Sequence, residues 1–215
     1  MKIKALLTDF DGTLVNKDIL DVVCGIVGKE ELSLQLNEEF VSGKREGLPT
    51  LITRINFLHN VSLLDIKERL AINNYLIPGA IELFNYLKAK DIVTILHSGN
   101  ILPVLEYYKN LLKISYVVGT NPKMSGDIID SISIEDFPGK DFKLVGCRNI
   151  LSQLAISPEF VLAMGDSPAD EQIFSFAAKS IAVNPKGGIE RFADFVIKDN
   201  LRNIIEIIEF LEDKN

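Results

Sequence analysis

The chain has 215 residues, of which 47% are hydrophobic and 25% are charged, and its formal net charge is −7. This length supports one well-buried core, or one core with a smaller appended domain. No run of Lys and Arg is longer than two residues, and an acidic chain without a basic patch is a poor partner for nucleic acid. We therefore expect no nucleic-acid partner. A small anionic substrate is still compatible with this composition, because a binding site needs only local positive charge.

The sequence carries no signal for a membrane or for secretion. The basic start at residues 1–4 is followed too soon by Asp9 for a signal peptide, and no apolar stretch approaches the ~20 residues of a membrane span. The two cysteines, Cys24 and Cys147, are far apart and suggest no disulfide framework. We expect a reduced, cytoplasmic setting without a membrane partner, and the oligomeric state stays open.

Short apolar, β-branched runs indicate buried strands. In chain order they are residues 3–7, 92–96, 116–118, 161–164, 181–183 and 195–197. Helical patterns lie between and after them, at residues 80–90, 101–112, 144–154, 170–178 and 201–210. This alternation of strands and helices predicts an α/β fold with a parallel sheet that is covered on both faces.

The stretch after the first strand breaks that alternation. It contains no convincing strand, and amphipathic helices are predicted at residues 19–27, 30–40, 50–58 and 64–72. Ser62 with Asp65 three residues later is typical of a helix N-terminus. We therefore predict a small helical domain at residues 16–75, inserted into a core of residues 1–15 and 76–215. A second irregular region, residues 120–136, is expected to form a hairpin or flap.

Two carboxylates stand where the first strand ends. Asp9 and Asp11 are separated by one residue and are followed by Gly12 and Thr13. Side chains at i and i+2 of an extended chain point the same way, so the two carboxylates can converge. They shift each other's pKa unless a cation or a shared proton separates them. This pattern indicates a metal site, a nucleophile paired with a general acid, or both; the alternative is an ordinary polar turn.

Two other predicted strands also end in polar residues. The second ends in His97-Ser98-Gly99-Asn100, and the fourth ends in Gly165-Asp166 followed by Asp170. Ligands of open α/β sheets bind beyond the carboxyl ends of the strands, and a cluster of carboxylates suits Mg²⁺ better than zinc. Ser98-Gly99 is expected to open a helix and to offer a hydroxyl and free N–H groups to an anion.

Each of these features also has a structural explanation. Ser98 can cap a helix, and Ser167 to Asp170 is a good capping sequence by itself. Lys143, taken alone, is one of many lysines. We expect His97 to pack at a strand end and His59 to lie in a loop, neither of them catalytic.

Together the motifs resemble those of the haloacid dehalogenase superfamily, in its phosphatase branch, and the resemblance spans nearly the whole chain. The motifs of that superfamily are D-x-D-x-T, a Ser or Thr ending a strand, a Lys, and G-D-x-x-x-D. They are matched, in chain order, by Asp9, Asp11 and Thr13, by Ser98, by Lys143, and by Gly165, Asp166 and Asp170. The resemblance implies a Rossmann-like core with a central parallel sheet, and it identifies the helical insert with the cap domain of these enzymes.

The resemblance also implies a role for each matched residue. Asp9 is expected to be the nucleophile that forms an aspartyl-phosphate, Asp11 the general acid and base, and Lys143 a positive charge beside them. Thr13 and Ser98 are expected to bind the phosphoryl oxygens. The predicted Mg²⁺ ligands are Asp9, Asp11 through its carbonyl, Asp166 and Asp170, the last of which would orient Lys143 or the metal waters.

Within the superfamily the chain looks most like the phosphoserine phosphatases. The cap residues that match theirs are Asp18 and Arg54, which we expect to bind the non-phosphate part of the substrate, near Gly99 and Asn100. The chain departs from the family's pattern at Gly12, Asp18, Asn100 and Ala169.

The prediction is a Mg²⁺-dependent phosphomonoester hydrolase acting on a small phosphorylated metabolite, phosphoserine first. One alternative is a phosphotransferase to a small alcohol such as homoserine. Another is a non-catalytic protein that binds a phosphorylated ligand on the same fold.

Overall fold

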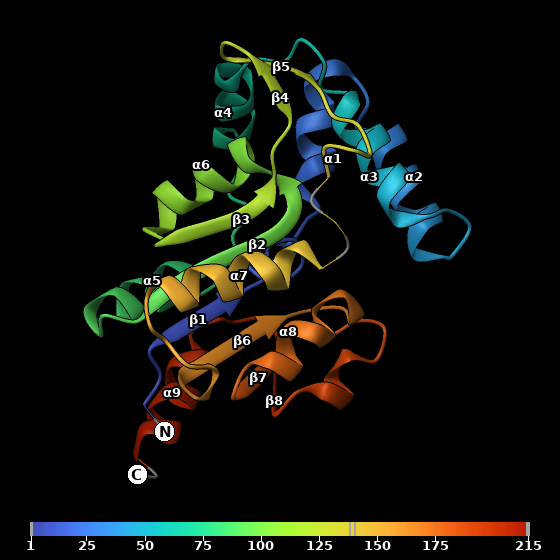
Figure 1. Cartoon of the computed structure of the whole chain (residues 1–215). Helices are drawn as coiled ribbons and strands as arrows, with labels where there is room; N and C mark the ends of the chain where they lie inside the picture. The colour runs from blue at the N-terminus through green and yellow to red at the C-terminus, as the bar shows by residue number, and fades with distance from the viewer. Residues whose placement is uncertain (1, 138, 140, 214–215) are drawn as a thin grey trace.

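The computed structural model describes residues 2–137, 139 and 141–213 and contains a six-stranded parallel sheet in the order β3-β2-β1-β6-β7-β8 (Figure 1). The strands are β1 (Ala5–Thr8), β2 (Val93–Ile101), β3 (Tyr116–Thr120), β6 (Val161–Gly165), β7 (Lys179–Val183) and β8 (Phe195–Ile197). Every adjacent pair in this sheet is parallel. The predicted α/β fold with a central parallel sheet is confirmed, and all six predicted strands are present.

Side chains alternate between the two faces of the sheet, as the two-residue period of a strand requires. Ala5, Leu7 and Ala163 point to one face, where they pack with helices α7 (Phe142–Gln153) and α8 (Glu171–Phe176). On the other face Leu6, Leu162 and their neighbours belong to the larger core cluster. That face is covered by α5 (Ala80–Ala89), α6 (Leu102–Leu112) and α9 (Asn203–Asp213). Strands buried on both sides explain the continuous apolar runs in the sequence.

The helices between β1 and α5 gather at one end of the sheet, beyond the tips of the strands (Figure 1). They are α1 (Ile19–Cys24), α2 (Glu30–Val41), α3 (Gly47–Asn56) and α4 (Leu63–Ala71), with a 3₁₀ turn at Gly25–Val27 between the first two. Other short 3₁₀ turns lie at Pro158–Phe160, Pro168–Asp170 and Ile189–Phe192. Ser62 and Asp65 form a reciprocal capping box at the start of α4, as their spacing predicts.

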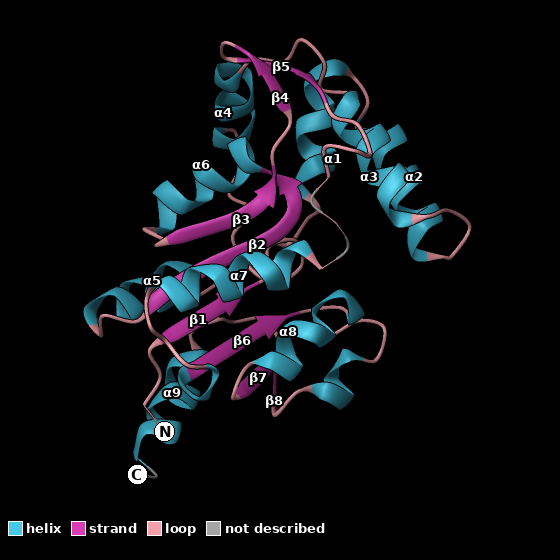
Figure 2. Cartoon of the chain, viewed as in Figure 1, coloured by secondary structure: helices cyan, strands magenta, loops and turns pink. Residues whose placement is uncertain are grey.

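The predicted hairpin in residues 120–136 is also present, as β4 (Lys123–Ser125) paired antiparallel with β5 (Ile128–Ser131). It lies against the helical group, because Ile129 N donates to Val61 O and Asn60 N donates to Ile129 O, both at 2.9 Å (Figure 2). The division of the chain into residues 16–75 and the remainder stays a prediction.

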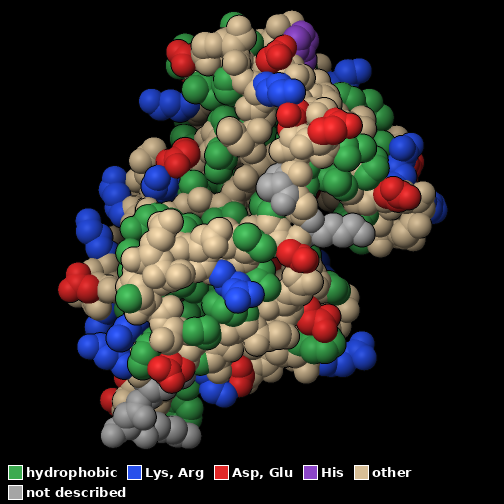
Figure 3. Space-filling model, viewed as in Figure 1, with side chains coloured by type: hydrophobic (Ala, Val, Ile, Leu, Met, Phe, Trp, Pro, Cys, Tyr) green, Lys and Arg blue, Asp and Glu red, His purple; other side chains and the backbone are tan. Residues whose placement is uncertain are grey.

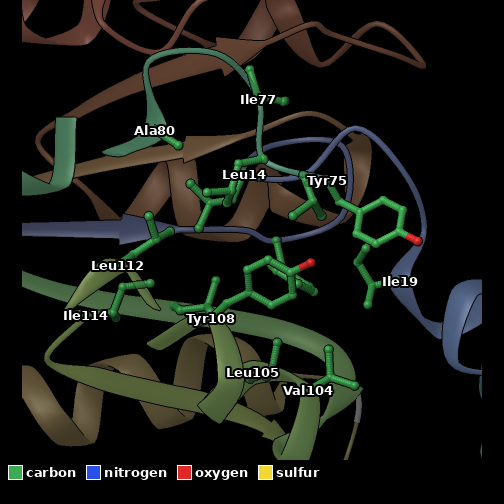
Figure 4. Packing of buried hydrophobic residues seen from close by; sticks show 14 of the residues in the cluster. Leu14, Ile19, Tyr75, Ile77, Ala80, Val104, Leu105, Tyr108, Leu112 and Ile114 are labelled. Carbon is green, nitrogen blue, oxygen red and sulfur yellow. The ribbon is translucent and has the colours of Figure 1, made fainter. Parts of the chain in front are cut away.

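A buried aromatic contact fixes the loop that follows β1. The Phe10 and Tyr108 rings meet edge to face, 4.8 Å apart between centroids. Tyr108 lies on α6 in the same buried cluster as Leu14 and Ile19 (Figure 4). Since Phe10 is buried in the core, the residues on either side of it, Asp9 and Asp11, are held at the sheet edge.

The structure corrects the expected start of α6. Ser98 and Gly99 do not open that helix, because β2 runs on to Ile101 and α6 begins at Leu102. The register with β3 shifts between His97 and Ile101, so residues 98–100 form an irregular stretch inside the strand. Two other boundaries move by a few residues: Lys143 lies within the first turn of α7, and α8 starts at Glu171.

No helix in the described part of the chain has the length and apolar character needed to cross a membrane.

Candidate active site

The first element of the site is the turn after β1. Asp9 continues the ladder, since its N–H donates to Met164 O at 3.0 Å, and Asp11 Oδ1 accepts from Ile19 N at 2.8 Å. Gly12 has φ +86°, and a Cβ there would lie 2.0 Å from Asp166 Oδ2. A side chain here would be strained, because the backbone angle favours glycine and a Cβ would have to displace the Asp166 carboxylate. The backbone therefore brings the two motif carboxylates and Asp166 close together.

The irregular end of β2 supplies the second element. Ser98 Oγ accepts from Asn100 N at 3.0 Å and lies 3.4 Å from Asp11 Oδ2 as a donor. The Asn100 side-chain amide donates to the same Asp11 oxygen at 3.3 Å. Both Ser98 and Asn100 are buried. Ser98 therefore lies at the sheet edge as predicted, but it belongs to strand β2 and not to the N-terminus of a helix.

Lys143 reaches the site from α7. Its ammonium lies 2.7 Å from Asp9 Oδ1 and 3.8 Å from Asp170 Oδ1. Burial opposes the charged ammonium, but the carboxylates of Asp9 and Asp170 outweigh it and raise the pKa of Lys143 above its ordinary value. Lys143 is therefore a fixed positive charge against Asp9.

The turn after β6 supplies Asp166 and Asp170. Asp170 is fully buried, and its Oδ2 accepts from the N–H groups of Asp166 and Ser167. Its Oδ1 has no hydrogen-bond partner among the described residues. Burial, with the charge of Asp9, raises the pKa of Asp170 to about 8. Asp170 is thus both the helix cap anticipated from the sequence and a carboxylate with one oxygen left over for the site.

Asp166 has a cation beside it. The ammonium of Lys186 lies 2.9 Å from Asp166 Oδ2, and burial followed by the charge of Asp9 raises the pKa of Asp166. Asp9, Asp11 and Asp166 line the same cavity, and they offer oxygen ligands of the kind that Mg²⁺ prefers. The residues present are therefore compatible with a magnesium ion at this edge of the sheet, and the predicted ligand set, with the Asp11 carbonyl, stays a prediction.

The helical group α1–α4, which is the predicted cap, contributes a buried ion cluster. Arg54 NH2 lies 2.8 Å from Asp18 Oδ1 and 2.9 Å from Asp21 Oδ1. The Arg54 Nε donates to Ser33 Oγ, and Asn37 bridges the cluster by donating to Asp18 Oδ2 at 3.1 Å. Asp18 is also the N-cap of α1, where its Oδ1 accepts from Leu20 N and Asp21 N, so one carboxylate serves both the helix start and the ion cluster. Arg54 is buried rather than solvated, and the charges of its two partners raise its pKa although burial opposes them.

A cavity of about 170 Å³ joins the core and cap elements. Its lining residues are Asp9, Asp11, Asp18, Leu20, Leu51, Arg54, Ser98, Gly99, Asn100, Lys143, Asp166 and Ser167. A larger cleft of about 630 Å³ shares Asp11, Asp18 and Asp166 with it and opens between α2 and the core, where the surface is notched (Figure 3). The cavity is therefore reached from solvent between cap and core.

Of the predicted site residues, Thr13 lies outside this lining and Asp170 lies behind it. Thr13 is fully buried, and its hydroxyl has no hydrogen-bond partner among the described residues. The structure brings the other predicted residues to one cavity. The chemical roles assigned to all of them stay predictions.

Sequence reasoning missed three residues that lie at or beside the site. Two of them, Asp21 and Lys186, belong to no motif of the sequence, and the structure places them against Arg54 and Asp166. His97 was expected to pack at a strand end, but its fully buried ring lies with Nδ1 3.9 Å from Asp9 Oδ1. The sequence does place His97 directly before Ser98, in a strand that ends at the site, and this position could have indicated that its ring lies near Asp9.

The buried carboxylates predict an unusual pH dependence of stability in the metal-free protein. Asp170 has a pKa of about 8, and burial raises the pKa of Asp11 well above its ordinary value. Between about pH 6.5 and 8 the folded state then holds protons that the unfolded state has lost, because unfolded carboxyls titrate near pH 4. Stability therefore falls as pH rises through this window. Below it His97, whose pKa burial lowers, works in the opposite direction.

Melting curves in EDTA should show Tm decreasing from about pH 6.5 to 8.5. Asp170→Asn should flatten this decrease, and Mg²⁺ should raise Tm most at the alkaline end. A Tm that stays level or rises over this range in EDTA would mean that these carboxylates are ionised in the folded protein.

Comparison with known proteins places the chain in a family. The family model of the haloacid dehalogenase-like hydrolases matches residues 6–175. The chain is 25% identical over 207 residues to the phosphoserine phosphatase of Campylobacter jejuni subsp. doylei, covering 96% of this chain and 100% of that one. It is 27% identical over 220 residues to the phosphoserine phosphatase of Methanocaldococcus jannaschii, covering 97% and 99%.

Solved structures show the same fold. The phospho-aspartyl intermediate analogue of phosphoserine phosphatase superposes with a TM-score of 0.81 at 24% identity, over 97% of this chain and 100% of that one. The match of the family model to most of the chain, together with these relatives, confirms the predicted enzyme class, a phosphatase. The chain belongs to the haloacid dehalogenase-like hydrolases.

Proposed function

We propose that this enzyme is a Mg²⁺-dependent phosphomonoesterase for a small phosphorylated metabolite, with phosphoserine as the first candidate. The observation that carries the proposal is the composition of the 170 Å³ cavity. Asp9, Asp11 and Lys143 line it from the core, and Asp18 and Arg54 line it from the cap. One cavity thus offers groups for phosphoryl chemistry and groups of both signs for the remainder of a substrate.

Asp9 is proposed as the nucleophile. An attacking carboxylate and an anionic phosphoryl group about 4 Å apart repel by roughly 4 kcal/mol at an effective dielectric near 20. The Lys143 ammonium, 2.7 Å from Asp9 Oδ1, offsets part of this repulsion. Attack of Asp9 on phosphorus forms the aspartyl-phosphate and releases the alcohol, which leaves after taking a proton.

Asp11 is proposed to supply that proton. Burial, followed by the charge of Asp18, raises the pKa of Asp11 well above its ordinary value, which keeps a proton available near neutral pH. The Ser98 hydroxyl and the Asn100 amide lie within 3.4 Å of Asp11 Oδ2, and they can hold the carboxylate in place after it gives up the proton. Asp11 can then activate the water that hydrolyses the intermediate.

Mg²⁺ is proposed to be held by Asp9, Asp166 and the Asp11 carbonyl, where it would neutralise phosphoryl charge. Asp170 supports this edge by accepting the N–H of Asp166 at 3.2 Å and by facing Lys143. Thr13 is proposed to assist at the phosphoryl oxygens only if its buried hydroxyl becomes accessible when substrate binds.

Phosphoserine carries an ammonium and a carboxylate beyond its phosphate. Asp18 and Arg54 present the opposite charges at the cap side of the cavity, and Arg can hold a carboxylate with two hydrogen bonds. The guanidinium already has Asp18 and Asp21 as partners. To bind a substrate carboxylate, Arg54 therefore has to share or give up its contact with one of these aspartates. The substrate ammonium would then pair with the aspartate that Arg54 releases.

The experiment that tests the function is phosphate release from a matched set of substrates, with Mg²⁺ and with EDTA. Phosphoserine should be turned over faster than phosphoethanolamine, which lacks the carboxylate, and faster than phosphoglycolate, which lacks the ammonium. Activity should vanish in EDTA and return with Mg²⁺. Equal rates of phosphate release from the three substrates would mean that the enzyme is a phosphatase that does not recognise the amino-acid part of phosphoserine. If no phosphomonoester released phosphate, the proposed function itself would be wrong.

Arg54→Ala is expected to raise KM for phosphoserine by about 10–100-fold, the cost of losing a charge-assisted pair of hydrogen bonds. It should leave p-nitrophenyl phosphate, which has no carboxylate, nearly unchanged. Arg54→Lys keeps the charge but loses the planar fork and should fall between the two. Arg45→Ala is the control, because Arg45 pairs with Glu39 on the surface of the cap. Equal losses on both substrates would make Arg54 a structural residue.

A further inference from the structure

We propose a second cation site on the Lys143 side of Asp9, formed by Asp9, His97 and Asp170, which binds a transition-metal ion such as Zn²⁺ or Co²⁺ and inhibits the enzyme. The site itself stands independently of the proposed function; only its inhibitory effect rests on it.

The geometry brings three ligand atoms together. One ligand atom from each of Asp9, His97 and Asp170 lies within 4.8 Å of the other two, and all three residues are buried. His97 Nδ1 is 3.9 Å from Asp9 Oδ1. Ligands of a zinc ion at about 2.0–2.2 Å end roughly 3–4 Å apart, so shifts of about 1 Å complete the coordination.

Two of the three residues also have unsatisfied polar atoms. In the described part of the chain, three buried atoms of these residues have no hydrogen-bond partner: the two ring nitrogens of His97 and Oδ1 of Asp170. Buried polar groups without a partner are unfavourable, so a ligand that pairs with them is stabilised. A cation beside Asp9 would take one ring nitrogen of His97 and one oxygen of Asp170 as ligands.

The donor set separates this site from the magnesium site. The magnesium site has only oxygen ligands, which suit a hard ion, whereas an imidazole nitrogen favours Zn²⁺, Co²⁺ or Ni²⁺ over Mg²⁺. The His97 ring is fully buried and its Nδ1 lies 3.9 Å from Asp9 Oδ1, so an imidazole nitrogen is in place as a metal ligand. Cellular Mg²⁺ would therefore leave this second site to softer ions.

The resident cation at this place is Lys143. Its ammonium lies 2.7 Å from Asp9 Oδ1 and 3.8 Å from Asp170 Oδ1, so a divalent ion on the same oxygens has to displace it. The metal would then hold Asp9 Oδ1 and remove the lysine charge from the nucleophile. Inhibition follows from both effects, and it requires no contact with substrate.

Co²⁺ is the probe, because its visible absorption reports ligand type without any turnover. The protein is titrated with Co²⁺ in excess Mg²⁺, which keeps the oxygen site filled. The wild type should give one visible band of a nitrogen-and-oxygen site. His97→Val should lose that band and weaken Co²⁺ binding by at least about tenfold, since even an outer-shell partner is worth 10–100-fold. His59→Gln is the matched control, because the chain has only these two histidines.

Lys143→Met should change Co²⁺ affinity in the opposite direction to His97→Val. A misfolded variant would not bind Co²⁺ more tightly, so this second variant separates loss of a ligand from loss of the fold. Removing the ammonium should tighten Co²⁺ binding, and Zn²⁺ should displace the Co²⁺ band in both wild type and Lys143→Met. In activity assays with p-nitrophenyl phosphate, Zn²⁺ should inhibit the wild type at concentrations at least about tenfold lower than His97→Val.

Three outcomes would overturn the site. One is equal Co²⁺ binding by wild type and His97→Val, when both melt cooperatively. Another is a band that depends on His59, or a thiolate charge-transfer band, which would place the ion on Cys147 or Cys24. The last is weaker Co²⁺ binding by Lys143→Met. None of these bears on whether the enzyme hydrolyses phosphoserine, so the two proposals fail separately.

Discussion

Asp9→Asn is expected to lower kcat by roughly 10⁴-fold or more, the loss seen when a covalent nucleophile is removed. Asn has nearly the same shape as Asp, and the backbone N–H of residue 9 can still donate to Met164 O, so the turn after β1 is preserved. What disappears is the attacking oxygen and the partner of the Lys143 ammonium. The measurement is phosphate release from phosphoserine and from p-nitrophenyl phosphate under saturating substrate.

The control for Asp9→Asn is Asp127→Asn, an exposed carboxylate in the β4–β5 turn. It removes the same charge from the chain and should keep full activity. If Asp9→Asn retained activity within about tenfold of wild type, attack would come from water or another residue, and the covalent mechanism would be wrong.

Asp11→Asn is expected to lower turnover of phosphoserine by roughly 10²–10⁴-fold, the usual contribution of a general acid and base. The loss should be smaller for p-nitrophenyl phosphate, because p-nitrophenolate leaves without a proton. The Asp11 carbonyl is unchanged by this substitution, so Mg²⁺ dependence should persist. The comparison therefore isolates proton transfer from metal binding.

The leaving-group comparison decides the role of Asp11. An equal loss on both substrates would indicate that Asp11 acts by position or charge. The Ile19 N–H bond to Asp11 Oδ1 makes such a structural role physically reasonable, so a melting curve of Asp11→Asn belongs with the assay.

Much of the fold follows from local patterns. The strand runs alternate with helices, and a sheet buried on both faces needs continuous apolar strands. The turn residues at Gly12 and the Ser62–Asp65 pair each specify one backbone geometry. Each motif follows a predicted strand, and the carboxyl ends of parallel strands meet at one edge of the sheet. The sequence therefore predicts that Asp9, Ser98 and Asp166 lie together at that edge.

The features that sequence reasoning missed all depend on pairing between distant segments. The end of β2 was misplaced because its continuation to Ile101 is set by pairing with Thr120 across a register shift, which no local pattern reveals. Asp21 joins Arg54 across two helices. The burial of His97 follows from its place in β2, which lies between β3 and β1 in the sheet, and only the assembled core puts its ring beside Asp9.

The central claim is that Asp9 becomes phosphorylated during turnover, and chemical trapping tests it most directly. The enzyme is mixed with phosphoserine and Mg²⁺, quenched in acid within the first turnovers, and reduced with borohydride, which converts an aspartyl-phosphate to homoserine. Peptide mass spectrometry should then find homoserine at position 9, and none there when substrate is omitted. Homoserine at Asp11 or Asp166 instead, or no conversion anywhere while phosphate is being released, would contradict the account.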